Sequence, residues 1–222
     1  MLTLQSKNDS IIQIPYRSKQ RVGILLSGGL DSGLLLNILD IACTDCTFMI
    51  FTMDKPDGSL RYADDIIKRS NLRNKWESVV VRGGKEDEVA SLGITGKTAF
   101  RHILDEYIED LDVLYSGNTS NPPQHIESTT YPPDRSVANK AVEKYEKFEM
   151  PFMYWDKSET VPLVSSLDME WLYEASHTCT ELDKGRCSQC WQCKEREWGF
   201  TENKMVDPGI KSVSYTHLRA HE

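Results

Sequence analysis

The chain has 222 residues, of which 39% are apolar, and this suits one α/β domain with a buried core and a small appendage. The formal net charge of −8 argues against tight, sequence-independent binding of nucleic acid, because that binding depends on lysine and arginine. No apolar run approaches the roughly 18 residues of a membrane span, and residues 1–17 lack the apolar stretch of a signal peptide. We therefore expect a cytoplasmic protein without a membrane partner.

In chain order, weak alternation over residues 1–20 predicts an edge strand. A short run of branched apolar residues at 22–26 predicts a buried strand, and crowded leucines over 30–41 predict a helix packed on a sheet. Between them lies the hexapeptide SGGLDS at residues 27–32. A strand, a glycine turn and a helix in this order are typical of a phosphate-binding loop.

The chemistry of the hexapeptide supports that interpretation. Its glycines let backbone N–H groups approach an anion at the positive end of the helix, and Ser27 and Ser32 add hydroxyl donors. Asp31 would repel a phosphate unless a cation lay between them, so we expect Mg²⁺ there. The alternative is a plain glycine turn with a serine N-cap. The lysine of a Walker loop and the spacing of a dinucleotide-binding loop are both missing.

Strands and helices then alternate. Buried strands are predicted over residues 47–53, 77–82 and 112–116, and helices over 59–71 and 98–110, with Ser59 as an N-cap and Gly83-Gly84 ending the third strand. This alternation predicts a doubly wound parallel sheet in a domain spanning residues 1–150. Ligands of such sheets bind at the carboxyl ends of the strands, where the hexapeptide should lie.

Residues 118–135 form a long irregular stretch with two Pro-Pro pairs. The fourth strand should deliver it to the same sheet edge, where it either covers a substrate or is a solvated loop. A charged helix is predicted over residues 137–148, and another helical stretch begins at residues 157–160.

A cluster of cysteines is the second strong pattern. The spacing C-x7-C-x2-C-x2-C suits one tetrahedral ion, and four thiolates would close its coordination shell, as in structural zinc sites. Scattered buried cysteines and an iron–sulfur cluster are the alternatives. We interpret the separate Cys43 and Cys46 as buried thiols in a reduced protein. The expected metal ligands are Cys179, Cys187, Cys190 and Cys193.

With these motifs the chain resembles the PP-loop ATP pyrophosphatases and, among them, the 7-cyano-7-deazaguanine synthase family of queuosine biosynthesis. The resemblance covers about residues 21–200. Residues 176–179 (SHTC) are similar to the family's S-x-T-C, and Lys157 with Glu159 fits its P-x(n)-K-x-E segment. Residues 131–135 (YPPDR) differ from its Y-P-D-C-R, and residues 117–121 also depart from the family pattern.

The resemblance implies an adenine nucleotide alpha hydrolase-like sheet and a small helical zinc region at residues 151–204. It also implies an ATP-dependent ligase that converts 7-carboxy-7-deazaguanine and ammonia to the nitrile, releasing AMP and diphosphate, and a homodimer. Asp31 would organise Mg²⁺, Lys157 would lie near the α-phosphate or be a solvated lysine, and Asp134 and Arg135 would contact the deazapurine. The residues expected to bind ATP are Leu26, Ser27, Gly28, Gly29, Leu30, Asp31 and Ser32.

Other functions stay open at this point. Another PP-loop adenylating enzyme, either an amidating ligase or a tRNA-modifying enzyme, and a non-catalytic nucleotide-binding protein share the loop. The last stretch, residues 205–222, ends in SVSYTHLRAHE, which has no periodicity and resembles translated adapter sequence. We expect an unstructured or artefactual tail there and leave it out of the fold.

Overall fold

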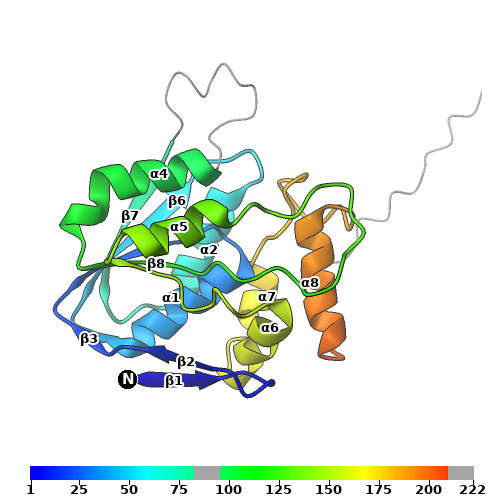
Figure 1. Cartoon of the computed structure of the whole chain (residues 1–222), viewed down its shortest axis with the longest axis horizontal. Helices are drawn as coiled ribbons and strands as arrows, with labels where there is room; N and C mark the ends of the chain where they lie inside the picture. Colours follow the sequence, from blue (N-terminus) through cyan, green and yellow to red (C-terminus); the bar gives the residue numbers. More distant parts are fainter. Residues whose placement is uncertain (83–95, 210–222) are drawn as a thin grey trace, which may run out of the picture.

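A parallel sheet of five strands forms the centre of the molecule, which is known from a computed structural model that describes residues 1–82 and 96–209 (Figure 1). The strand order is β7-β6-β4-β8-β9, and every neighbouring pair is parallel. The predicted doubly wound parallel sheet is therefore confirmed. Its strands are β4 (Arg21–Leu25), β6 (Thr47–Met53), β7 (Lys75–Val81), β8 (Val113–Ser116) and β9 (Phe148–Glu149).

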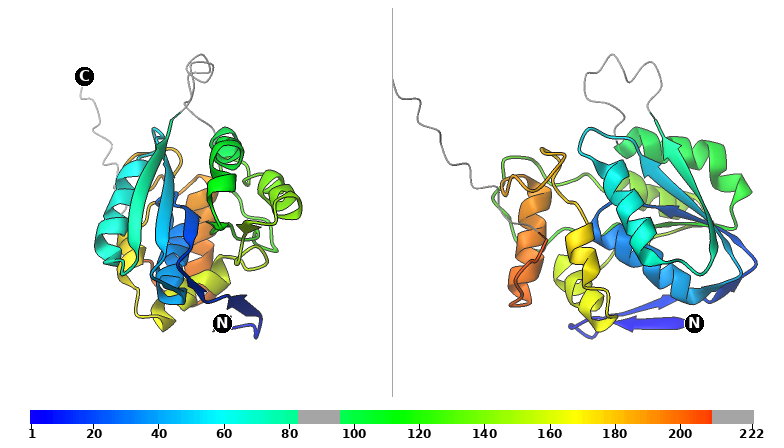
Figure 2. Two further views of the ribbon diagram at one scale, coloured as in Figure 1. Left: turned by 90° about the vertical axis from the view of Figure 1, so that its left-hand side faces the viewer. Right: turned by 180° about the vertical axis from the view of Figure 1, so that it is seen from behind.

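Helices cover both faces of the sheet (Figure 2). Phe48 and Ile50 of β6 pack toward α1, α2 and α7, whereas Met49 and Phe51 pack toward α4 and α5. Both sides of β6 are thus buried, which explains its continuous apolar sequence. The helices are α1 (Leu30–Ala42), α2 (Ser59–Ser70), α4 (Gly96–Tyr107), the 3-10 helix η1 (Ile108–Asp110), α5 (Ser136–Lys144), α6 (Lys157–Ser166), α7 (Trp171–Ala175) and α8 (Trp191–Glu202).

The chain enters the sheet at its central strand. From β4 it continues outward through β6 to β7, and then returns to the other side of β4 to form β8 and β9. The crevice beyond the carboxyl ends of β4 and β8 is therefore the point where the strand order reverses, which is where open α/β sheets bind ligands.

The prediction of an edge strand over residues 1–20 was wrong, because no strand of this segment joins the five-stranded sheet. This segment forms a separate antiparallel hairpin of β1 (Leu2–Gln5) and β2 (Ile11–Ile14), followed by β3 (Arg17–Ser18). β3 pairs with β5 (Cys43–Thr44) in a second small sheet. One buried side of the hairpin joins the α1 core, so hydrophobic packing, and not sheet pairing, holds it.

Several element boundaries also differ from the prediction. Ser59 is the first residue of α2 and not its cap; Gly58 occupies that position with a φ of 77°. The helix expected over 137–148 ends at Lys144, because Phe148 is buried beside β8 in the short strand β9. β7 begins two residues earlier than expected, and Gly83-Gly84 lie outside the described residues.

The C-terminal region consists of α6, α7, the cysteine segment and α8, and it packs against α1 (Figure 1). A capping box formed by Asp156 and Glu159 fixes the start of α6. The guanidinium of Arg196, which is fully buried, forms two hydrogen bonds with the Asp207 carboxylate at 2.8 and 2.9 Å. This ion pair holds residues 205–209 beside α8. The rest of the expected tail lies outside the described residues.

Candidate nucleotide and metal site

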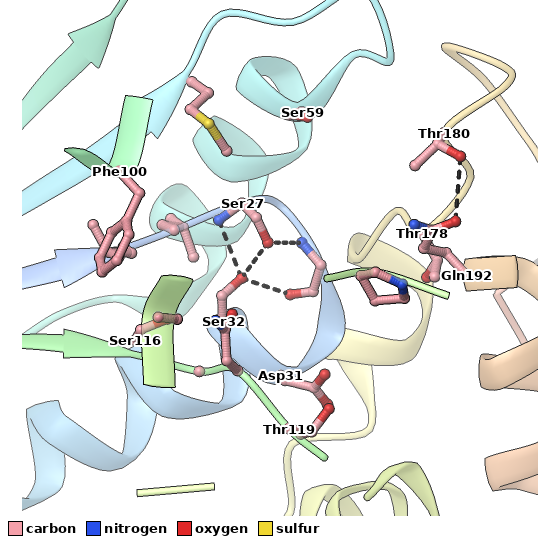
Figure 3. Close-up of a pocket in the computed structure, with 18 of the residues that line it drawn as sticks. Ser27, Asp31, Ser32, Ser59, Phe100, Ser116, Thr119, Thr178, Thr180 and Gln192 are labelled. Carbon is pink, nitrogen blue, oxygen red and sulfur yellow. Dashed lines mark hydrogen bonds between the residues drawn. The ribbon is translucent and has the colours of Figure 1, made fainter. Parts of the chain in front are cut away.

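The turn at residues 27–32 connects the carboxyl end of β4 to α1 (Figure 3). Ser27 and Ser32 are held together by their hydroxyl groups at 3.0 Å, and the Ser27 N–H donates to Ser32 Oγ at 3.2 Å. Gly29 is the N-cap of α1, and no side chain caps it. The start of α1 thus keeps backbone N–H donors available to an anion.

Both the backbone conformation and the close surroundings of position 28 require a glycine. Its φ is +76°, and a Cβ built on it would lie 2.7 Å from the Ser59 carbonyl oxygen. α2 therefore packs directly on the turn. The neighbouring Leu26 and Leu30 are buried in the core, so these two predicted residues anchor the turn.

Asp31 meets two residues of α6. The Lys157 ammonium donates to Asp31 Oδ2, and the Thr160 hydroxyl donates to Oδ1 at 2.9 Å. Lys157 is only 5% exposed, so the alternative of a solvated lysine is wrong. Thr160, which the sequence analysis missed, is fully buried and shares the face of α6 with Lys157, three residues away.

A cavity of about 420 Å³ opens in front of this cluster. Figure 3 shows the paired Ser27 and Ser32 at its centre, Phe100 on one side, and Thr178 and Gln192 on the other. β4, β8, α1, α4, α5, α6 and α8 contribute to its wall. It lies at the reversal point of the strand order, as the sheet topology leads one to expect.

The irregular stretch 118–135 contributes to the cavity at both of its ends. Asn118 and Thr119 line it where the stretch leaves β8, and Asp134 and Arg135 line it where α5 begins. Its middle part contacts the cysteine region, where the Thr130 hydroxyl accepts from the backbone N–H of Trp191 at 2.9 Å. The two ends of the stretch are thus part of the cavity wall, whereas most residues between them are exposed.

The two predicted substrate residues have different surroundings. The Asp134 carboxylate accepts from the Ser136 N–H at 3.0 Å and pairs with Lys97 at 3.1 Å. The hydrogen bonds from Ser136, with that from Lys97, lower the pKa of Asp134 to about 2. Arg135 donates to Glu195 Oε1 at 2.9 Å and to the Thr119 carbonyl. Glu195 was not predicted.

The four predicted metal ligands converge. The Sγ atoms of Cys179, Cys187, Cys190 and Cys193 all lie within 4.8 Å of one another. Backbone N–H groups point at two of the sulfurs; Cys190 N–H, for example, lies 3.2 Å from Cys187 Sγ. Such a set fits one metal ion with tetrahedral sulfur ligands, and thiolates of this kind suit zinc or an iron–sulfur cluster.

His177 connects this cysteine segment to the turn. Its backbone N–H donates to the Gly28 carbonyl at 2.9 Å, and its ring stacks on Tyr62 of α2 with ring centroids 4.3 Å apart. Burial lowers the pKa of His177, which favours the neutral form of the stacked ring. The first expected metal ligand follows two residues later.

Residues 124–204 match the family model described as queuosine biosynthesis protein QueC. Over this region the chain is similar to QueC. It is also 31% identical over 109 residues to a 7-cyano-7-deazaguanine synthase of Frankia casuarinae, a match that covers 47% of this chain and 44% of that protein. The chain therefore spans less than half the length of the curated relative that it matches.

Two solved structures have a similar arrangement at low identity. One is the U34-tRNA thiolase NcsA of Methanococcus maripaludis with its [4Fe-4S] cluster, with a TM-score of 0.46, 16% identity, and coverage of 69% of this chain and 59% of that one. The other is an NMN synthetase of Francisella tularensis, with a TM-score of 0.46, 15% identity, and coverage of 87% and 79%.

In the described parts of the chain, no helix has the length and apolar character that crossing a bilayer requires. The match to the QueC model begins at residue 124 and ends at residue 204, so it includes Lys157 and all four cysteines but not the turn at residues 27–32. The roles of the individual site residues stay predictions.

Proposed function

We propose that the protein is an ATP-dependent ligase that converts 7-carboxy-7-deazaguanine and ammonia to 7-cyano-7-deazaguanine. The observation that carries this proposal is the cluster of Asp31, Lys157 and Thr160 at a serine- and glycine-rich helix start, on a cavity at the reversal point of the sheet. The QueC match and the deazaguanine synthase relative support the choice of acceptor.

The phosphates of ATP would bind at the turn. Backbone N–H groups at the start of α1 and the hydroxyls of Ser27 and Ser32 donate to the terminal phosphate oxygens. The Lys157 ammonium then lies close enough to the turn to neutralise charge on the α-phosphate as diphosphate leaves. Mg²⁺, which Asp31 would hold, supplies further neutralisation of the phosphate charge.

The chemistry proceeds in two rounds. The acceptor carboxylate attacks the α-phosphorus of ATP, diphosphate leaves, and ammonia displaces AMP from the acyl adenylate to give the amide. The amide oxygen attacks the α-phosphorus of a second ATP and diphosphate leaves; the adenylated amide then loses AMP and both of its N–H protons to form the nitrile. The role of the protein is to position the reactants and stabilise phosphate charge.

The four-cysteine cluster would hold its ion away from this chemistry, because four protein sulfurs leave no open coordination position. Its contribution is to fix the segment that carries His177 and the start of α8. We therefore propose a structural ion, with zinc as the metal.

The test is a reaction with ATP, ammonium and 7-carboxy-7-deazaguanine, in which AMP and the deazapurine product are detected by mass spectrometry. We expect the nitrile and two AMP per product, and we expect Asp31→Asn to lose AMP release. An amide as the end product would indicate an amidating ligase. Acceptor-dependent AMP release by Asp31→Asn at the normal rate would contradict the proposed phosphate site.

A further inference from the structure

The cavity has a second polar wall, on the α8 side, that the proposed phosphate chemistry does not use. It is formed by Thr119, Arg135, Gln192 and Glu195. Glu195 is 3% exposed and sits on α8 three residues after Gln192, so both side chains project from the same face of the helix.

The Glu195 carboxylate on this wall is buried, and Arg135 binds one of its two oxygens. One hydrogen bond of 2.9 Å joins Arg135 Nη2 to Glu195 Oε1, so Oε2 lies outside the pair. The Thr119 hydroxyl, which is also buried, has no hydrogen-bond partner among the described residues. A largely buried carboxylate oxygen is costly when no donor reaches it, and a polar ligand in the cavity would supply a donor to Glu195 Oε2.

The donors and acceptors of this wall restrict what it can bind. Arg135 presents N–H donors beside a carboxylate acceptor, and a carboxylate accepts well from neighbouring ring N–H and amino groups. A planar ring with a carbonyl next to an N–H and an amino group offers the complementary order, as on the Watson–Crick edge of guanine. A ring without the amino group would lose one charge-assisted hydrogen bond.

We propose that Glu195, positioned by Arg135, is the specificity-determining residue that reads the amino and ring N–H groups of a 2-amino-4-oxopyrimidine in the acceptor. This rests on the proposed function for the choice of acceptor. Glu195 receives these two N–H groups, and Arg135 faces the ring carbonyl. The carboxyl group of the acceptor then points toward the phosphate side of the cavity.

Direct binding tests this assignment without requiring turnover. Calorimetry would compare 7-carboxy-7-deazaguanine with its 2-desamino analogue on the wild-type chain, Glu195→Gln and Glu197→Gln. Glu197 lies on the exposed side of α8, where it pairs with Lys194, so it is a matched control. The wild type and the control should prefer the 2-amino compound roughly 10- to 100-fold.

In Glu195→Gln that preference should fall to within about threefold, because the amide replaces one acceptor oxygen with a donor. Arg135 keeps an oxygen partner in this variant, so a purely structural role predicts equal weakening for both compounds. If Glu195→Gln does not fold, Glu195→Asp, which withdraws the carboxylate by one methylene, should lower the preference at least several-fold.

An undiminished preference in the folded variant, or no preference in the wild type, would overturn the proposal. AMP release by the same proteins, after ATP and ammonium are added, separates the ligase hypothesis from the proposed role of Glu195. A preference for the 2-amino compound without AMP release would reject the proposed ligase activity and keep the role of Glu195. AMP formation without discrimination would reject the role of Glu195 alone.

Discussion

Asp31 is the residue at which the turn, α6 and the proposed chemistry meet. Both of its oxygens already have protein partners, the ammonium of Lys157 and the hydroxyl of Thr160. These two contacts fix the orientation of the Asp31 carboxylate, and a phosphate-bound cation would need a carboxylate ligand there. A change at Thr160 therefore acts through Asp31 and leaves the phosphate donors of the turn in place.

We predict that Thr160→Val reduces the rate of AMP formation about tenfold, because it keeps the side-chain volume and removes one hydrogen bond to a charged group. Thr160→Ser, which retains the hydroxyl, should recover most of that rate. The measurement is kcat and KM for ATP over a range of Mg²⁺ concentrations. Equal activities of the valine and serine variants would show that the hydroxyl does not orient Asp31.

Gly28 and Gly29 allow a second prediction at this scale. Gly28→Ala should lower the free energy of unfolding by about 1–2 kcal/mol or more, because an L-residue resists a φ of +76° and its Cβ would collide with the Ser59 carbonyl. Gly29→Ala should cost less, since its nearest neighbour would be Ser27 Oγ at 3.3 Å. Urea unfolding of both variants measures the difference, and equal losses would contradict it.

At the scale of elements, Asp40 ties α1 to the connection between α2 and β7. Its carboxylate accepts from the backbone N–H groups of Arg73 and Asn74 and from the Asn74 amide at 2.8 Å. Burial alone would raise the pKa of Asp40, but the hydrogen bonds from Asn74 and Arg73 outweigh it and hold the pKa below its usual value.

The sign of the resulting pH dependence follows from that lowered pKa. Asp40 stabilises the fold above the pKa of the unfolded carboxyl, near pH 4, and loses this effect as the pH falls through its lower folded pKa. We predict that Asp40→Asn costs about 1–3 kcal/mol at pH 7 and distinctly less at pH 3. Denaturant unfolding at both pH values measures it; a cost independent of pH would contradict the prediction.

The sequence predicted elements where one physical signal dominates. β6 was predicted with its observed bounds because it is apolar on both faces, and α1 to within one residue. β9 was missed because two residues carry no periodicity, and Phe148 joins the core through contacts distant in sequence, with β8 by strand pairing and with Phe100 of α4. Thr160 and Glu195 were missed for a similar reason, since their partners are distant in sequence and no motif marks them.

At the scale of the whole molecule, the cysteine cluster supports the turn at residues 27–32 through His177. We predict about one zinc ion per chain, and that Cys190→Ser or a strong chelator removes it and lowers the Tm. Cys46→Ser, a buried cysteine outside the cluster, is the matched control for metal content. Metal analysis and thermal unfolding measure both effects. Iron with sulfide in the purified protein would contradict zinc.

Asp207 should matter to the fold in spite of its position near the end of the described chain. Its carboxylate pairs with two arginines, Arg196 and Arg186, and the first of these is completely buried. We predict that Asp207→Ala lowers the free energy of unfolding by about 3–5 kcal/mol, because it leaves buried guanidinium charge uncompensated. Asp183→Ala, which removes a largely exposed partner of Arg61, should cost much less in the same unfolding experiment.

The charges on the cavity wall have a kinetic consequence. Among the described residues, each acidic side chain on the wall pairs with a basic one that also lines it: Asp31 with Lys157, Asp57 with Lys55, Asp134 with Lys97, and Glu195 with Arg135. An arriving polyanion thus meets balanced charge on a chain whose net charge is −8. Long-range attraction cannot accelerate its encounter, and the cations must exchange partners before they hold it. Nucleotide association should therefore be slow relative to diffusion and stay level or rise as ionic strength increases.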